Sequence, residues 1–440
     1  MDQRERNRRL VRSTLAVSGP TLLSRVFGFV RDLIQAYYMG TGRGMDAFTI
    51  AYTIPNLLRR LTGEGAMTAA FVPVFTQMKK EKTRQDLWRF AHCFFFDLSL
   101  IMALITVLGI VFAPVLVKLI SIGFKDVAGK WDLTIMLTRI MFPYIFLVSL
   151  AALAMAILNS FHKFFVPALT PVLFNLSIIT IAVVFAARSE EPSFVFAAGV
   201  VVGGVFQLGF QLPYLWRQGM RFHPMLSFSH PGVRKVAKLM VPGVFGAGLY
   251  QINYAVSRMI ASLLEEGSVS SLYYAARVQE LTLGIFAIAL SIALLPTFSD
   301  FAAKNDILGM KKTLVYAFKL IFFVSLPAMV GLLLMSRPII MVLFQRGQFD
   351  ERSTAMSASC LFFFAMGIPF ISGVRIMAPA FYSLKDIKTP VIVASFIMLL
   401  YIGFSLILMG PLRVGGIALA LALASVFHFV ALFILLERKI

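Results

Sequence analysis

The chain has 440 residues, of which 59% are hydrophobic and 14% are charged, and its formal net charge is +20. A soluble domain usually has about 45–50% apolar and about 25% charged residues, so this composition excludes an ordinary soluble protein. Apolar runs of about 20 residues or more follow one another along the whole chain, which predicts a polytopic helical membrane protein, and the positive charge therefore does not indicate nucleic-acid binding.

The apolar runs predict an all-α fold with twelve transmembrane helices. Short polar stretches separate them, and the ends are set by Pro, Gly and charged residues. The predicted spans are 13–39, 46–77, 88–118, 133–160, 167–187, 193–216, 236–263, 271–298, 312–335, 354–383, 389–409 and 414–436.

Basic residues predict the orientation of these spans. The two termini and alternate loops carry 23 Lys and Arg residues, whereas the opposite loops carry 9. Because Lys and Arg are retained on the cytoplasmic side of a membrane, both termini are predicted to be cytoplasmic.

The first span contains charges that lipid would not tolerate. In "LLSRVFGFVRDLI", Arg25 and Asp32 are seven residues apart and lie on nearly one line of a helix. Ser24 and Arg31 form a second line about a quarter-turn away, with Gly28 between the arginines. These residues predict a polar wedge on one side of an otherwise apolar helix.

Further charges occur in the second and eighth spans. In "IPNLLRRLTGEGAM", Arg60 and Glu64 are four residues apart and could pair, which leaves Arg59 pointing elsewhere. In "YYAARVQEL", Arg277 and Glu280 are three residues apart on one face. Internal salt bridges that hold helices together are an alternative interpretation of both pairs.

Three pairs of short motifs recur at a nearly constant separation in the sequence. "FVPVFT" is matched by "LLPTFS", "SFHKFFVP" by "SLKDIKTP", and "APVLVKLISIG" by "RPIIMVLFQRG". The matched positions are Pro73 and Pro296, Ser160 and Ser383, and Pro114 and Pro338. The sequence thus predicts a duplication into an N-terminal lobe, residues 1–228, and a C-terminal lobe, residues 229–440. Six spans per lobe give both lobes the same orientation, as in transporters with parallel repeats around a central cavity.

Basic residues within the spans outnumber acidic ones, and all of them are arginines. A charge at the centre of a span costs about 2.5–3.5 kcal/mol, so such residues face protein or water. A planar guanidinium matches the oxygens of phosphates and carboxylates. Acids are too few to neutralise Arg25, Arg31 and Arg59, and we therefore predict an anion-binding site. The bases are Arg25, Arg31, Arg59, Arg60, Arg139, Arg258, Arg277 and Arg375, and the acids are Asp32, Asp46, Glu64, Asp97 and Glu280.

No motif indicates catalysis or a metal. "GFKDVAGKW" has five residues between its glycines, where a Walker A loop has four, and Trp131 stands where Ser or Thr would bind magnesium. The two cysteines, Cys93 and Cys360, lie far apart within apolar runs. We therefore predict neither a catalytic nor a metal site.

Four stretches together resemble one family. "SRVFGFVRD", "DAFTIAYTIPNLLRRLTGEGAMTAAFVPVF", "YYAARVQE" and "APAFYSLKDIKTP" closely resemble the MurJ (MviN) family of lipid II flippases, from about residue 14 to 436. That family belongs to the exporter superfamily that includes multidrug antiporters and polysaccharide-lipid exporters.

The resemblance implies a bilobed transporter that moves undecaprenyl-pyrophosphate-linked disaccharide-pentapeptide from the inner to the outer leaflet of the bacterial cytoplasmic membrane. It also implies a central cationic cavity for the head group. The family's essential arginines correspond here to Arg25, Arg31, Arg59 and Arg277, and its sensitive polar positions to Ser24, Asp32, Asp46, Glu64 and Glu280.

Two departures from the family pattern stand out. Many members have fourteen spans, the last two forming a groove for the polyprenyl tail, whereas this sequence ends at "LLERKI" after twelve. The tail is thus expected to be held differently, or the sequence is truncated. Relatives often carry Asp before the eighth-span arginine, where this chain has Ala276.

Other functions stay open at this point. An exporter of another polyprenyl-pyrophosphate glycan and a multidrug antiporter are the alternatives, although an antiporter for cationic drugs would need acids in the cavity. No cofactor is expected, and coupling to the membrane potential or to a monovalent cation is left open. The expected partners are lipid II, membrane lipids and proteins of cell-wall assembly.

Overall fold

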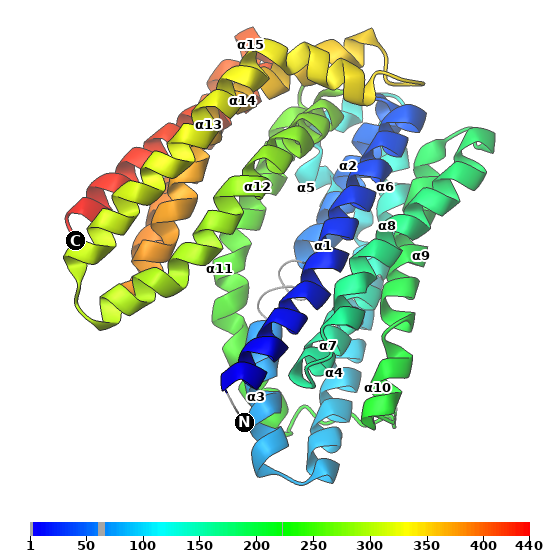
Figure 1. The fold of residues 1–440 in the computed structure, drawn as a ribbon. Helices are drawn as coiled ribbons and strands as arrows, with labels where there is room; N and C mark the ends of the chain where they lie inside the picture. The colour runs from blue at the N-terminus through cyan, green and yellow to red at the C-terminus, as the bar shows by residue number, and fades with distance from the viewer. Residues whose placement is uncertain (1–2, 60–66, 222) are drawn as a thin grey trace. The chain divides into compact units, whose positions relative to one another are not determined.

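The computed structural model describes residues 3–59, 67–221 and 223–440. In these ranges the chain forms helices and no strand (Figure 1). Two compact units are present: the first comprises residues 1–39 and 47–255, and the second comprises residues 40–46 and 256–440. These bounds differ from the lobes 1–228 and 229–440, because the boundary lies within a helix and because residues 40–46 belong to the second unit. These residues, which include the first turn of α2, are called the turn 40–46 below.

The first unit is built from the helices of the N-terminal part of the chain, up to residue 255. Within it, α1 packs on α8, α8 on α9, and α7 on α3, α4 and α9. Its helices are α1 (Gln3–Met39), most of α2 (Arg43–Arg59), α3 (Met67–Glu81), α4 (Arg84–Val111), α5 (Ala113–Ile120), α6 (Lys130–Met141), α7 (Pro143–Ser160), α8 (Phe165–Phe185), α9 (Pro192–Gly209), α10 (Leu212–Gln218) and most of α11 (Pro231–Ser262).

The second unit is built from four long helices and the end of α11. Helix α14 packs on α12, α13 and α15, and Figure 1 shows α13, α14 and α15 side by side. The four helices are α12 (Ser268–Ala303), α13 (Ile307–Phe344), α14 (Glu351–Ser383) and α15 (Lys388–Glu437).

Two helix starts agree with the predicted duplication. At the start of α4, the side chain of Thr83 accepts a hydrogen bond from the Asp86 N–H, 3.2 Å away. At the start of α13, Asp306 accepts one from the Gly309 N–H, 2.8 Å away. Both bonds are N-caps. The two acceptors, Thr83 and Asp306, are separated in the sequence by the same distance as the repeated motifs. The same separation holds for the two donors, Asp86 and Gly309. Different side chains thus begin the two helices in the same way.

The ends of α7 and α14 repeat the pattern. His162 and Lys385, which occupy matching positions of the repeated motifs, both have a positive φ, of 58° and 59°. The next residue in each case donates from its N–H to a carbonyl in the last turn, Lys163 to Leu158 and Asp386 to Phe381, both at 3.0 Å. This geometry closes a helix by satisfying its last carbonyls.

Two very long helices are interrupted, one of them where the repeat predicts a break. Helix α13 loses helical backbone geometry at Met335, which matches Val111, the last residue of α4, at the separation of Pro114 and Pro338. Helix α15 is interrupted at Arg413 (φ 49°, ψ −131°). At about 1.5 Å per residue, its 50 residues are long enough for two crossings of a bilayer core of about 30 Å.

The predicted all-α, multi-span class is confirmed. In the described residues, seven helical stretches are long and apolar enough to cross a membrane, or eight if α12, bent by 41° between Gly284 and Ala287, counts as one. The count of twelve spans stays a prediction.

Candidate functional site

In the first unit, Arg31, one of the two arginines of the polar wedge, is hydrogen-bonded on two sides. The guanidinium of Arg31 donates to the Asp32 carboxylate, with the nearest pair of atoms 2.7 Å apart. It also donates to the side-chain carbonyl oxygen of Asn175 on α8, 3.0 Å away. The two charged side chains are 11% and 4% exposed. The expectation that Arg31 carries an uncompensated charge is therefore wrong, because its neighbour in sequence neutralises it.

Asn175 is a site residue that the sequence analysis missed. Its amide also donates to the Ser24 carbonyl oxygen, 3.2 Å away, so it links α8 to two positions of α1. Gly28 lies beside this contact, because a Cβ there would be 3.6 Å from the Asn175 amide nitrogen, an ordinary van der Waals distance. The only signal in the sequence was a single amide within an apolar run.

Arg59, near the end of α2, belongs to the same surroundings. Its guanidinium donates twice to the Asn56 side chain, at 3.1 and 2.9 Å. The hydroxyl of Tyr144 on α7 interacts electrostatically with both Arg59 and Arg31, and it donates to the Gln207 side chain at 3.4 Å. The structure thus brings Arg31, together with its partner Asp32, and Arg59 into the surroundings of Tyr144.

Other predicted residues of the first unit lie apart from this cluster or outside the described chain. Arg25 is exposed, and within the described residues it has no hydrogen-bond or ion-pair partner. Ser24 is half-buried and takes part through its carbonyl. Glu64 and the predicted Arg60–Glu64 pair lie outside the described residues.

In the second unit, Arg277 and Glu280 form an ion pair on α12, as the alternative interpretation of these residues expected. Arg277 donates to the Glu280 carboxylate at 3.1 Å, and the side chains are 33% and 43% exposed. The same guanidinium donates to the Tyr273 hydroxyl at 3.2 Å and lies 4.9 Å from the centre of that ring. Because the pair is partly solvated, the guanidinium remains accessible to an anion.

Asp46 is buried rather than open to a ligand. Its carboxylate is bound at the start of α12: one oxygen accepts from the Ser270 N–H and hydroxyl, and the other accepts from the Gly267 N–H, at 2.7–2.8 Å. The residue is 1% exposed. An anion at a helix N-terminus satisfies free N–H groups and interacts favourably with the helix dipole. Asp46 thereby attaches the turn 40–46 to the second unit.

Other bonds hold the same turn. Thr41 and Ser353 share a hydrogen bond between hydroxyls at 2.7 Å, and the Arg43 N–H donates to Glu266 at 2.9 Å. Next to it, Glu265 is bound by Arg352 and Arg413. Burial works against the charged form of Glu265, but the hydrogen bonds from these two arginines hold its pKa below the ordinary value.

We expect Asp46→Asn to destabilise the attachment of the turn 40–46. The new amide would place an NH₂ group against N–H donors, and a lost buried hydrogen bond to a charged group costs about 1.5–3 kcal/mol. Hydrogen–deuterium exchange of residues 40–46 should accelerate at least tenfold. Arg43→Ala is the matched control, because Arg43 contributes its backbone N–H and not its side chain to the bond with Glu266. Unchanged exchange in Asp46→Asn would contradict the assignment.

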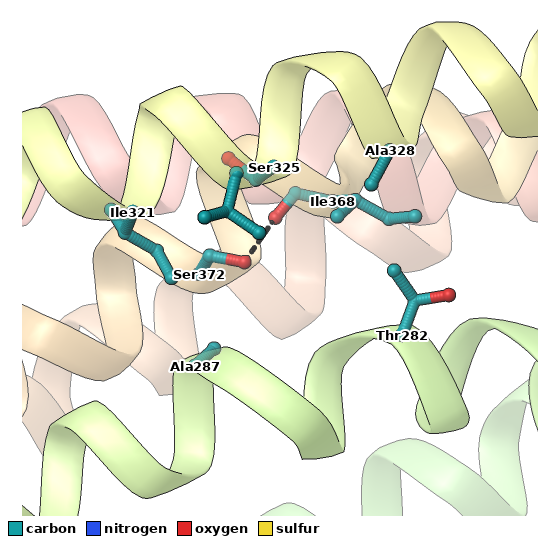
Figure 2. Close-up of a pocket in the computed structure, with 8 residues that line it drawn as sticks. Thr282, Ala287, Ile321, Ser325, Ala328, Ile368 and Ser372 are labelled. Carbon is teal, nitrogen blue, oxygen red and sulfur yellow. Dashed lines mark hydrogen bonds between the residues drawn. The ribbon is translucent and has the colours of Figure 1, made fainter.

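A small cavity between α12, α13 and α14 has no part in this arrangement. Figure 2 shows Ser325, Ile368 and Ser372 among its lining residues, and the cavity measures about 10 Å³. The Ser372 hydroxyl donates to the Ile368 carbonyl of its own helix at 2.7 Å. The cavity is thus a packing gap of about one water molecule.

In the described part of the chain, no three His, Cys, Asp or Glu residues are placed to hold a metal ion.

Sequence comparisons show what this chain is similar to. The profile of the family described as "Lipid II flippase MurJ" matches residues 35–440. A protein of Vibrio cholerae named "Probable lipid II flippase MurJ" is 37% identical over 88% of this chain and 75% of its own length. The "Lipid II flippase MurJ" of Burkholderia cenocepacia is 33% identical over 98% of this chain and 84% of its own length.

Solved structures give the same result. "Lipid II flippase MurJ, inward closed conformation" superposes with a TM-score of 0.82 at 28% identity, and the match covers 96% of this chain and 87% of that one. An inward-facing multidrug transporter of the MATE family superposes with a TM-score of 0.79 at 12% identity, covering 97% of this chain and 98% of that one. The second likeness concerns the fold alone.

Proposed function

Because this chain belongs to the lipid II flippase MurJ family, we propose that it moves lipid II from the inner to the outer leaflet of the bacterial cytoplasmic membrane by alternating access. The protein is a multi-pass inner-membrane transporter. Its proposed substrate is a peptidoglycan precursor whose sugar-peptide head is joined to a polyprenyl chain through a pyrophosphate. The proposed orientation, with both termini in the cytoplasm, is supported by the excess of basic residues in one set of loops.

The observation that carries the proposal is the pair of guanidinium groups near Tyr144. Arg31 and Arg59 both interact electrostatically with this hydroxyl, and Arg31 is also paired with Asp32. Arginine binds phosphate oxygens through two parallel N–H donors and stays charged when buried. A pyrophosphate is therefore the chemistry that this cluster suits, and a cationic drug is not.

We propose that Arg277 supplies a further guanidinium from the second unit. Its partly solvated pair with Glu280 can release one N–H donor, while the hydrogen bond to Tyr273 keeps the side chain in place. Arg25, exposed and without a partner in the described residues, is proposed to meet the head group as it enters.

Binding of the anion would favour closure of the transporter. Neighbouring guanidinium groups repel one another in a low dielectric, and a bound pyrophosphate reduces that repulsion. A membrane potential that is negative inside assists export of an anion by about 2.3 kcal/mol per charge per 100 mV. We propose this potential, or a monovalent cation, as the source of coupling.

The test is the accessibility of lipid II in each leaflet. In cells depleted of their own flippase, expression of this chain should restore lipid II to the outer leaflet, where an externally added enzyme or antibiotic can reach the head group. A charge reversal, Arg59→Glu, should abolish the restoration at equal protein level. The proposal fails if lipid II stays inside with the wild-type chain, or if a different polyprenyl-pyrophosphate glycan is exported in its place.

A further inference from the structure

The segment that joins α10 to α11 lies along α4. We call residues 219–230 the linker segment; residue 222 is outside the described chain. Beside its start, Arg84 donates to the Gln218 carbonyl at 3.0 Å. Farther on, the His223 ring packs edge-on against His92 at 5.8 Å, and His230 stacks on Phe90 at 5.6 Å. The linker segment is therefore attached to α4 over several turns.

The deepest of these attachments is a buried carboxylate. The Ser227 N–H donates to one oxygen of Asp97, 2.9 Å away, and Asp97 is 2% exposed. The other carboxylate oxygen is buried, and within the described chain it has no hydrogen-bond partner. An ionised carboxylate normally accepts several hydrogen bonds when it is buried, and one bond does not offset the loss of water. This environment suits a neutral carboxylic acid better than an ion.

The surrounding groups do not supply a compensating charge at neutral pH. His230, the nearest histidine, has its pKa lowered by burial and by the charge of Arg89, so it is neutral at pH 7. Cys93 lies one turn before Asp97 on α4, and Asp86 faces His230. The His92 and His223 rings face each other on the same side of α4. Arg89 is a fixed cation near Cys93 and His230, and it is an exposed residue.

We propose that Asp97 is a proton-binding site closed over by the linker segment, and that release of the proton loosens the linker segment from α4. With the proton on the unpartnered oxygen, the other oxygen still accepts from the Ser227 N–H. When the proton is released, the carboxylate becomes charged and is stabilised by hydration. Water can reach it only if the linker segment moves away from α4. The inference concerns the proton alone and does not depend on which lipid the protein carries.

Cys93 offers a native reporter for this movement. It is 1% exposed and lies close to Ser227 of the linker segment. Cys360 is the only other cysteine of the chain and is buried on α14, so Cys360→Ser leaves Cys93 as the single thiol. The experiment measures maleimide labelling of Cys93 in the purified full-length protein between pH 5.5 and 8.5. The rate at each pH is divided by that of the unfolded chain at the same pH, which removes the intrinsic effect of pH on the thiol.

The normalised rate is expected to rise at least tenfold with pH in the otherwise unchanged protein. Asp97→Asn, which imitates the neutral acid, should keep Cys93 protected at every pH. Asp97→Ala, which removes the acceptor, should expose it at every pH. His230→Gln should preserve the pH response, because that response is assigned to Asp97. A flat profile in the parent protein, or an unaltered pH response in Asp97→Asn, would overturn the proposal.

Hydrogen–deuterium exchange gives a second measurement that needs no substitution. Protection of the amides around Ser227, corrected for the intrinsic pH dependence of exchange, should fall over the same pH range as labelling of Cys93 rises. Equal protection across the range would also refute the proton site. Neither measurement uses lipid transport. Failure of the proton site is therefore distinguishable from failure of the proposed function.

Discussion

Arg59→Ala is expected to lower the rate of lipid II export by about 10- to 100-fold. A charge-assisted hydrogen bond contributes about 1.5–3 kcal/mol, and about 1.36 kcal/mol corresponds to a factor of ten. Arg59→Lys should recover only part of the rate, because an ammonium group keeps the charge but cannot form two parallel bonds to a pyrophosphate. The measurement is the initial rate of lipid II appearance in the outer leaflet at matched protein levels.

Arg139→Ala is the matched control for Arg59. Arg139 also lies in the membrane-embedded part of the sequence, but it is exposed and donates to the Ile110 carbonyl at 3.3 Å. Its removal should leave export unchanged. Wild-type export in Arg59→Ala, with normal amounts of folded protein in the membrane, would reject a role for Arg59 in binding the substrate.

Arg31→Ala is expected to destabilise the first unit by about 3–5 kcal/mol, because it leaves the Asp32 carboxylate buried without its ion-pair partner. Asp32 is 3% exposed, so solvent cannot replace the guanidinium without a rearrangement of α1. The measurement is the free energy of unfolding in denaturant, with the purified protein in detergent.

Two further variants separate the effect of charge from that of packing. Arg31→Gln with Asp32→Asn removes both charges and should recover most of the stability, since neither partner is then left as a buried ion. Asn175→Ala should destabilise by a smaller amount, about 1–3 kcal/mol, because it removes one acceptor of the Arg31 guanidinium. If Arg31→Ala proves as stable as the parent, the pair with Asp32 contributes nothing to folding.

Features set by neighbours in sequence could be predicted. The pair of Arg277 and Glu280 follows from helical spacing alone, and the structure contains it. The duplication was inferred from Pro and Gly motifs, and the N-caps at Thr83 and Asp306 repeat at the same separation. Ion pairs and N-caps of this kind depend on residues that are close together in the sequence, so they can be predicted from the sequence.

Features set by tertiary packing could not be predicted. Asn175 and Arg31 are 144 residues apart and meet only because α1 packs on α8. Adjacent residues point about 100° apart on a helix, so Arg31 and Asp32 were not expected to pair. The long arginine side chain bridges this angle because Asn175 holds its other end. The count of twelve spans stays a prediction, although the break of α15 at Arg413 lies between two of the predicted spans.

The position of Asp46 has a consequence for biosynthesis. Its partners at the start of α12 lie 221 and 224 residues later in the chain. At about 5–20 residues per second, a ribosome needs on the order of 10–45 seconds to make the intervening stretch. During that interval the carboxylate lacks these partners. Membrane insertion of the first two helices therefore precedes their final anchoring, which is completed only when the second half of the polypeptide arrives.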